Sequence, residues 1–207
     1  MAKKKFKGKI SGVQPRIRLL RSFDQSSHSY LGYNIFLEGT IEGDHRKFII
    51  AIGKSTQAKF KFQPGQHIQG VCTSVINPLN EIAEYFKVSQ LSIIDSTALK
   101  IEPPPYLELP KDLEIYRERG HRRLAAKSYN TTCQYCHWAC KMPTVILIDQ
   151  WDQSKKKYRV ETFCYGPKSC RYYVAGPVRK VPGRRGMVWE EEDWVDEENT
   201  SHRGPDE

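Results

Sequence analysis

The stretch "FQPGQHIQGVCTSV" at residues 62–75 reads as a tight turn that leads into a strand. Proline presets φ and glycine accepts positive φ, so Pro64 and Gly65 suit the turn. A second stretch, "FKVSQLSII" at residues 86–94, predicts another strand, and "NPLNEIAEY" between the two predicts a short helix or a loop. This part of the chain is therefore expected to end on two consecutive strands.

Further strands are predicted upstream, where apolar and polar residues alternate. Tyr33 and Ile35 fall on one face of the second such segment, and Tyr30 and Phe36 fall on the other. "STQAKF" at residues 55–60 suits a short helix. Five or so strands in about ninety residues predict a mainly β fold with a small Greek-key barrel. The upstream segments are "FKGKISG" (6–12), "SYLGYNIFLEG" (29–39) and "HRKFIIAIG" (45–53).

The turn-and-strand pattern, followed by "YFKVSQLSII" at residues 85–94, resembles the last two strands of the OB-fold family. In that family the fourth strand begins with a step of the form hydrophobic-x-x-G-[DQ]-x-[IV]-x-[GV]. The resemblance covers roughly the first hundred residues, and SH3-like barrels share its motif. It implies a barrel that binds single-stranded DNA, RNA or, in some members, protein.

Five of the six cysteines lie in one short region, between "NTTCQYCHWACKMP" (130–143) and "ETFCYGPKSC" (161–170). Cys133-x-x-Cys136 is a knuckle of the kind that brings two thiolates to one zinc ion. Two alternating strands around "DQSKK" predict a β-hairpin that returns the chain to this knuckle and delivers Cys164 and Cys170. The layout resembles a zinc ribbon, although five residues rather than two separate the second pair. We expect Zn²⁺ on Cys133, Cys136, Cys164 and Cys170.

Cys140 leaves alternatives open. It could pair with Cys136 on a helical turn, act as a fifth ligand, or be a spare. Three close cysteines and one remote cysteine would also suit an iron–sulfur cluster. His137 could replace one thiolate, and a nucleophilic cysteine would need a base such as His121 or His137 within reach. Cys72 lies in a strand pattern and is expected in the core.

The net charge of +9 is unevenly distributed. The last 21 residues carry nine acids and one arginine, a net charge of −8, so the other 186 residues carry +17. Such a basic body attracts polyanions. The acidic tail is expected to be disordered, because its few apolar residues cannot form a core alone. It could be a solvated end, fold back onto the basic face, or anchor a partner protein through Trp189 and Trp194.

Basic and aromatic residues interleave around the cysteine module and on the predicted barrel. Cations meet phosphates, and flat rings stack on bases. The candidate nucleic-acid-binding residues are Lys5, Lys7, Lys9, Arg16, Arg18, Tyr30, Phe36, Trp151, Lys155, Lys156, Lys157, Tyr158, Arg171, Arg184 and Arg185.

Together these patterns predict a non-enzymatic protein that binds single-stranded DNA or RNA, with a structural zinc module. The chain has no Walker loop, dinucleotide glycine fingerprint or His-Glu metalloprotease motif. A scaffold subunit of a larger assembly and an iron–sulfur redox or sensor protein are the alternatives. With no apolar run of membrane-spanning length and no secretory h-region, we expect a cytoplasmic, intracellular location. The expected organisation is a barrel (1–100), a Pro-rich linker and helix (101–127), a cysteine module (128–186) and the tail (187–207).

Overall fold

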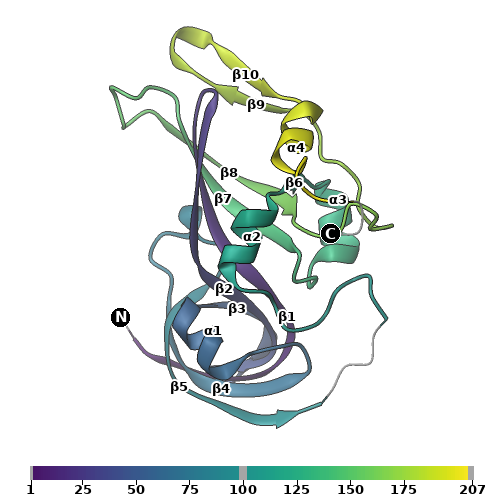
Figure 1. Cartoon of the computed structure of the whole chain (residues 1–207). Coiled ribbons are helices and arrows are strands. Elements are labelled where there is room, and N and C mark those ends of the chain that lie inside the picture. The colour runs from purple at the N-terminus through teal and green to yellow at the C-terminus, as the bar shows by residue number, and fades with distance from the viewer. Residues whose placement is uncertain (1, 98–101, 205–207) are drawn as a thin grey trace.

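A computed structural model describes residues 2–97 and 102–204 of the chain. The fold is mainly β, with one large mixed sheet and a separate two-stranded sheet (Figure 1). The expected boundary between the barrel and the linker, at residues 100 and 101, lies outside the described residues. The strands are β1 (Lys4–Ser22), β2 (Gln25–Ile41), β3 (Asp44–Ile52), β4 (Gln66–Ser74), β5 (Tyr85–Ser96), β6 (Arg122–Arg123), β7 (Ala139–Leu147), β8 (Lys156–Cys164), β9 (Arg179–Pro182) and β10 (Val188–Glu191).

The first five strands pair in a ring. β1 is antiparallel to β2, β2 to β3 and β4 to β5, while β3 runs parallel to β5. β4 returns to the start of β1, where Phe6 lies opposite Gly70. Alternate residues of β1 point inward, so Phe6 and Ile10 are buried while the lysines between them are exposed. The predicted alternation of this segment is confirmed.

β1 is long enough to belong to both halves of the molecule. Its first residues pair with β4, and Leu19 to Arg21 pair in parallel with Thr144 to Ile146 of β7. The hairpin of β7 and β8 is thereby added to the same eight-stranded sheet. One hydrophobic cluster runs from Phe6 in β1 to Tyr165 after β8, so the two halves share a continuous core.

Short helices fill the connections. The expected helix between the third and fourth strands is present as α1. The helix before the cysteine module, α2, ends at Arg119 and is followed by Gly120, where φ is +65°. No helix in the described ranges is both long and apolar enough to cross a membrane. The helices are α1 (Lys54–Phe60), η1 (Pro78–Asn80), α2 (Leu113–Arg119), α3 (Ala126–Ser128), η2 (Tyr129–Cys133), η3 (Arg184–Gly186) and α4 (Asp193–Asn199).

The C-terminal segment, residues 187–204, is folded, which corrects the expectation of a disordered acidic tail. It forms β10 and α4; Trp189 of β10 packs on Phe23 in the β1–β2 turn, and His202 contacts the Glu118 carbonyl oxygen of α2. The reason is electrostatic: Arg123 is fully buried and pairs with Asp196 at 2.9 Å and with Asp193. Arg21, also buried, pairs with Glu191 at 2.6 Å. The acids of this segment thus neutralise arginines that the rest of the chain buries.

Candidate cysteine centre and nucleic-acid interface

Four of the five clustered cysteines come from two places that the sheet brings together. Cys133 ends the short helix η2, and Cys136 follows in a turn in which the Cys136 N–H donates to the Cys133 carbonyl at 3.0 Å. Cys164 ends β8 directly opposite Ala139, just after the knuckle, and Cys170 lies in the next loop. The hairpin predicted between the two pairs is β7 and β8, and it returns the chain to the knuckle.

The thiols of these four residues interact electrostatically. Burial raises the pKa of Cys133 to about 12, and repulsion from Cys164 and Cys170 adds to the effect. Burial likewise raises the pKa of Cys136 to about 12, with Cys164 and Cys133 contributing. The two pairs of cysteines therefore lie within range of one another's charge. A cation that accepted thiolates would reverse the pKa increase.

Main-chain amides point at two of the sulfurs. The N–H of Gly166 donates to Cys164 Sγ at 3.3 Å. The backbone amides of Trp138 and Tyr106 lower the pKa of Cys136 and so oppose part of the effect of burial. A Cβ at position 166 would meet Trp138 Cβ at 3.2 Å, so the glycine permits this close approach. Amides directed at sulfur are the outer-shell contacts that orient thiolate ligands in metal sites.

Gln14 of β1 holds the knuckle from the barrel side. Its buried side-chain Nε2 lies 2.9 Å from the Cys136 carbonyl oxygen and 3.2 Å from that of Cys133. Its Oε1 accepts from the hydroxyl of Tyr129 at 2.7 Å. Nearby, a Cβ on Gly12 would lie 2.7 Å from Tyr135 Cβ, so only glycine allows the knuckle to pack this closely on β1. Gln14 was not among the residues predicted from the sequence, where its only signal is a polar residue within a buried strand.

The donor chemistry of the four cysteines fits a tetrahedral zinc site, which takes thiolates. As the side chains stand, however, no group of three or more histidine, cysteine, aspartate or glutamate residues in the described ranges forms a metal-holding arrangement. Zinc therefore stays a prediction that rests on the donors, their proximity and the amides around them.

The other cysteines and the nearby histidine are occupied elsewhere. The Cys140 thiol is fully buried and donates to the Pro15 carbonyl at 3.3 Å, and burial raises its pKa. Cys72 is a buried core residue whose thiol faces the Lys4 carbonyl. The ring nitrogens of His137 lie 3.3 Å from the Tyr116 hydroxyl and 3.3 Å from a Glu108 carboxylate oxygen.

Three hairpin turns meet at one end of the molecule (Figure 1). The Gln150 amide donates to the Ser22 hydroxyl at 2.9 Å, which joins the β7–β8 turn to the β1–β2 turn. Arg184, in the β9–β10 turn, lies 3.6 Å from Asp149. We call the basic and aromatic side chains gathered here the hairpin-tip surface. It comprises Trp151, Lys155, Lys156, Lys157, Tyr158, Arg184 and Arg185, all exposed.

The remaining candidates for nucleic-acid contact lie elsewhere. Lys5, Lys7 and Lys9 line the outer side of β1 near the opposite end of the molecule, and exposed Arg171 follows Cys170. The four remaining residues are engaged or enclosed. Arg16 and Arg18 both pair with Glu81, and Tyr30 lies under the Arg117 guanidinium at 5.0 Å.

Phe36 was expected to be an exposed platform for a base, and the structure shows that it is buried. It is only 6% exposed and packs edge-on against Tyr135 at 5.7 Å. The physical reason is that the cysteine knuckle covers this face of β2, so both faces of the strand are buried there.

The chain matches no protein-family model, no curated protein and no solved structure.

Proposed function

We propose that this protein binds single-stranded nucleic acid through the hairpin-tip surface, on a scaffold made of an OB-like barrel and a zinc-stabilised cysteine module. The observation that carries the proposal is the meeting of the three turns, two of which bring together the exposed rings and lysines of residues 151–158 and the arginines of residues 184–185. Trp151 is 78% exposed and Tyr158 is 41% exposed. Exposed rings beside cations suit stacking on bases with phosphate contacts alongside.

The charge of this surface is only partly neutralised. Lys155 pairs with Asp152 at 3.2 Å, and Arg184 lies near Asp149. Lys156, Lys157 and Arg185 form no ion pair with any residue that the structure describes. Unpaired cations can exchange their counterions for phosphates, which is the main source of affinity for nucleic acid.

The ring of strand pairings supports the OB-like part of the proposal. An OB-fold is a five-stranded, partly open Greek-key barrel. Here five strands pair in the order β1, β2, β3, β5, β4 and back to β1. In that family the loop after the first strand belongs to the binding region. The corresponding turn here is the β1–β2 turn, which adjoins the hairpin-tip surface.

Zinc is proposed in preference to an iron–sulfur cluster because of Cys140. The iron–sulfur hypothesis uses Cys140 as one of three close ligands. The Cys140 thiol instead faces the Pro15 carbonyl inside the core. Cys133, Cys136, Cys164 and Cys170 would hold the zinc, which would fix the knuckle to the end of β8. Metal analysis and the visible absorption of protein purified without oxygen test this. Zinc in a colourless sample supports the proposal, and a brown, iron-containing sample contradicts it.

The test of function is fluorescence anisotropy of labelled single-stranded DNA and RNA over a range of salt concentrations. The variant Lys156→Ala, Lys157→Ala, Arg185→Ala should bind more weakly. Its slope of log K against log salt should fall by about 2, because each single-strand phosphate contact contributes roughly 0.7. The control Lys54→Ala, Lys59→Ala, Lys61→Ala removes the same charge from the α1 region and should leave the slope unchanged. Equal effects in the two variants, or no binding at moderate salt, would favour a scaffold role.

A further inference from the structure

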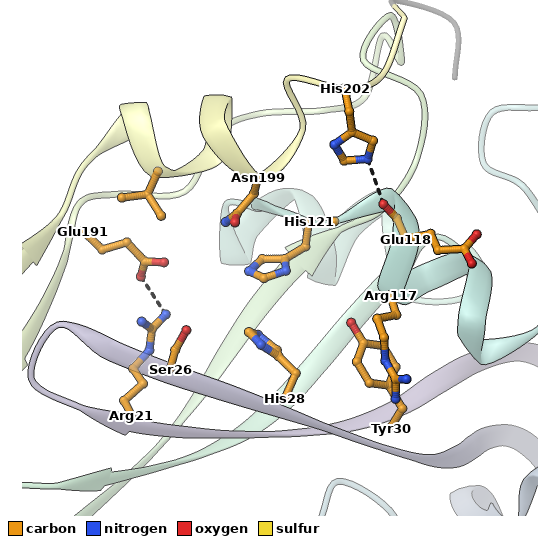
Figure 2. Close-up of a pocket in the computed structure, with 12 residues that line it drawn as sticks. Arg21, Ser26, His28, Tyr30, Arg117, Glu118, His121, Glu191, Asn199 and His202 are labelled. Carbon is orange, nitrogen blue, oxygen red and sulfur yellow. Dashed lines mark hydrogen bonds and ion pairs between the residues drawn. The ribbon is translucent and has the colours of Figure 1, made fainter.

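A cavity of about 450 Å³ lies between the β1–β2 hairpin, the turn after α2 and the C-terminal segment (Figure 2). Its floor carries Ser26, His28 and Tyr30 of β2, and His121 faces them from above. The volume is within the range of pockets that hold small ligands, about 300 to 1,000 Å³. None of these four residues belongs to the proposed zinc site or the hairpin-tip surface.

The walls are made of flat groups. The rings of His28 and His121 lie 4.7 Å apart, and His121 packs edge-on against Phe163 at 4.6 Å. The Arg117 guanidinium lies 5.0 Å from the centre of the Tyr30 ring. Aromatic rings and guanidinium planes are the surfaces on which proteins stack unpaired nucleobases.

Hydrogen-bonding capacity in the cavity is unused. His28 Nε2 is buried and has no hydrogen-bond partner among the described residues. A buried polar atom without a partner costs free energy unless a ligand or water satisfies it. Burial lowers the pKa of both imidazoles, with Arg21 adding to the effect on His28 and His28 to the effect on His121, which favours their neutral forms. A neutral imidazole has one donor and one acceptor, as a base edge requires.

The charge around the cavity suits an anion. Arg117 forms no ion pair with a carboxylate in the described part of the chain: Glu114, one turn earlier, feels its charge but is paired with Lys54. Glu191, which also lines the cavity, is taken by Arg21 at 2.6 Å, and the Glu118 carboxylate is turned away from the imidazoles (Figure 2). Arginine is well suited to phosphate recognition because its donors are fixed in a planar fork.

The roof of the cavity is held in place by close contacts. At Gly120 a Cβ would lie 2.1 Å from the Asn199 carbonyl oxygen, so α4 approaches the end of α2 as closely as backbone allows. His202 Nε2 lies 2.7 Å from the Glu118 carbonyl oxygen. The cavity is therefore built into the folded chain, with its roof supplied by the C-terminal segment.

We propose that this cavity binds a single nucleotide, with the base against His28, His121 and Tyr30 and the phosphate at Arg117. The nucleotide is either free in solution or the phosphorylated end of a strand. If the nucleotide is the end of a strand, the inference rests on the proposed function. If the nucleotide is free, the inference is independent of the proposed function.

Calorimetric titration of the full-length protein with the four nucleoside monophosphates, the matching nucleosides and inorganic phosphate tests the inference. At least one monophosphate should bind. Arg117→Gln should weaken it about tenfold and weaken the nucleoside much less, because the phosphate contact is lost and the nucleoside has no phosphate. His28→Phe keeps a flat ring but removes both nitrogens, and should weaken nucleotide and nucleoside alike. Arg117 is exposed on α2, so its replacement leaves the fold intact, which circular dichroism checks.

The outcomes separate this inference from the proposed function. Absence of monophosphate binding at millimolar concentration, or binding that neither variant weakens, would overturn it. Competition between a monophosphate and an end-phosphorylated oligonucleotide, but not its unphosphorylated counterpart, identifies the strand end as a source. Monophosphate binding without such competition identifies the free nucleotide. The triple variant of Lys156, Lys157 and Arg185 should lose strand affinity and keep monophosphate binding, so either proposal can fail while the other stands.

Discussion

The side-chain amide of Gln14 lies 2.9 Å from the carbonyl oxygen of Cys136, a residue 122 positions later in the chain. The contact links the first strand to the cysteine knuckle. Gln14 is 2% exposed, and its side-chain Oε1 accepts a hydrogen bond from the Tyr129 hydroxyl. The shape of the knuckle therefore depends on a strand of the proposed barrel as well as on its own turn.

Gln14→Leu should loosen the knuckle, because it leaves buried carbonyl oxygens of Cys133 and Cys136 without this donor. The expected loss is about 1 to 3 kcal/mol of unfolding free energy. If zinc is bound, its release to a chromogenic chelator should be faster. Gln69→Leu, at an exposed position of β4, is the control and should change neither quantity. Equal chelator kinetics in wild type and Gln14→Leu would show that the knuckle does not depend on β1.

Cysteine substitutions distinguish ligands from core residues. Cys164→Ser should abolish stoichiometric zinc, since one of four thiolates is lost. Cys140→Ser should keep the metal and lower only the melting temperature, because its thiol faces the Pro15 carbonyl in the core. In cobalt-substituted protein, the intensity of the cobalt–thiolate absorption band reports how many thiolates bind the metal. Loss of the cobalt–thiolate band in Cys140→Ser would return Cys140 to the ligand set.

The sequence predicted those features that depend on nearby residues. Alternation along residues 6–12 predicted the outward lysines of β1, and the polar turn "DQSKK" predicted the hairpin that carries Cys164 toward the knuckle. Such patterns repeat within a single element, so one sequence reveals them.

Long-range pairings explain what the sequence could not predict. Arg123 and Asp196 are 73 positions apart, and nothing near either residue indicates the other. The composition of the acidic tail indicated disorder. The prediction was wrong because the partners of the acids, Arg21 and Arg123, lie buried in strands far away in the sequence. Phe36 was expected to be exposed because Tyr135, which covers it, belongs to another part of the chain. In each case the deciding contact is tertiary, and the local composition does not indicate it.

Asp196→Asn should destabilise the whole fold, because it leaves the fully buried Arg123 with a weakened ion pair. Removal of one partner of a buried pair costs about 3 to 5 kcal/mol, and the amide that replaces it recovers part of this. Thermal unfolding followed by circular dichroism measures the loss. Glu197→Gln with Glu198→Gln changes exposed acids of the same helix and serves as the control. If the control variant melted as early as Asp196→Asn, general charge rather than the pair would hold the segment.

The His28 and His121 pair should make the protein unstable in mild acid. Burial and the charge of Arg21 lower the pKa of His28 from 6.5 to about 4. Burial, His28, Arg179, Arg21 and Arg203 lower the pKa of His121 well below its usual value. The unfolded state therefore binds more protons below pH 6.5, so stability falls as the pH drops from 6.5 toward 4.

Glu161 adds to the loss at lower pH. Burial alone would raise its pKa, but hydrogen bonds and charge from Arg21 hold the pKa below 4.5. Denaturant melts at several pH values give the unfolding free energy as a function of pH. Between pH 6.5 and 4 this free energy should fall less steeply in His28→Phe than in the wild type. An identical slope in wild type and variant would mean that His28 does not titrate in the unfolding transition.

Trp151→Ala should weaken binding of single strands without affecting stability, if the hairpin-tip surface is the interface. The ring is 78% exposed, so its loss removes little packing. One stacked base contributes about 1 to 3 kcal/mol, and the affinity should fall accordingly. Trp151→Phe keeps a flat ring and should retain most of the affinity, which separates stacking from mere loss of surface. Because the ring carries no charge, the salt dependence should stay at the wild-type slope, in contrast to the lysine and arginine variants. Unchanged affinity in Trp151→Ala would remove the aromatic contribution and leave a purely electrostatic surface.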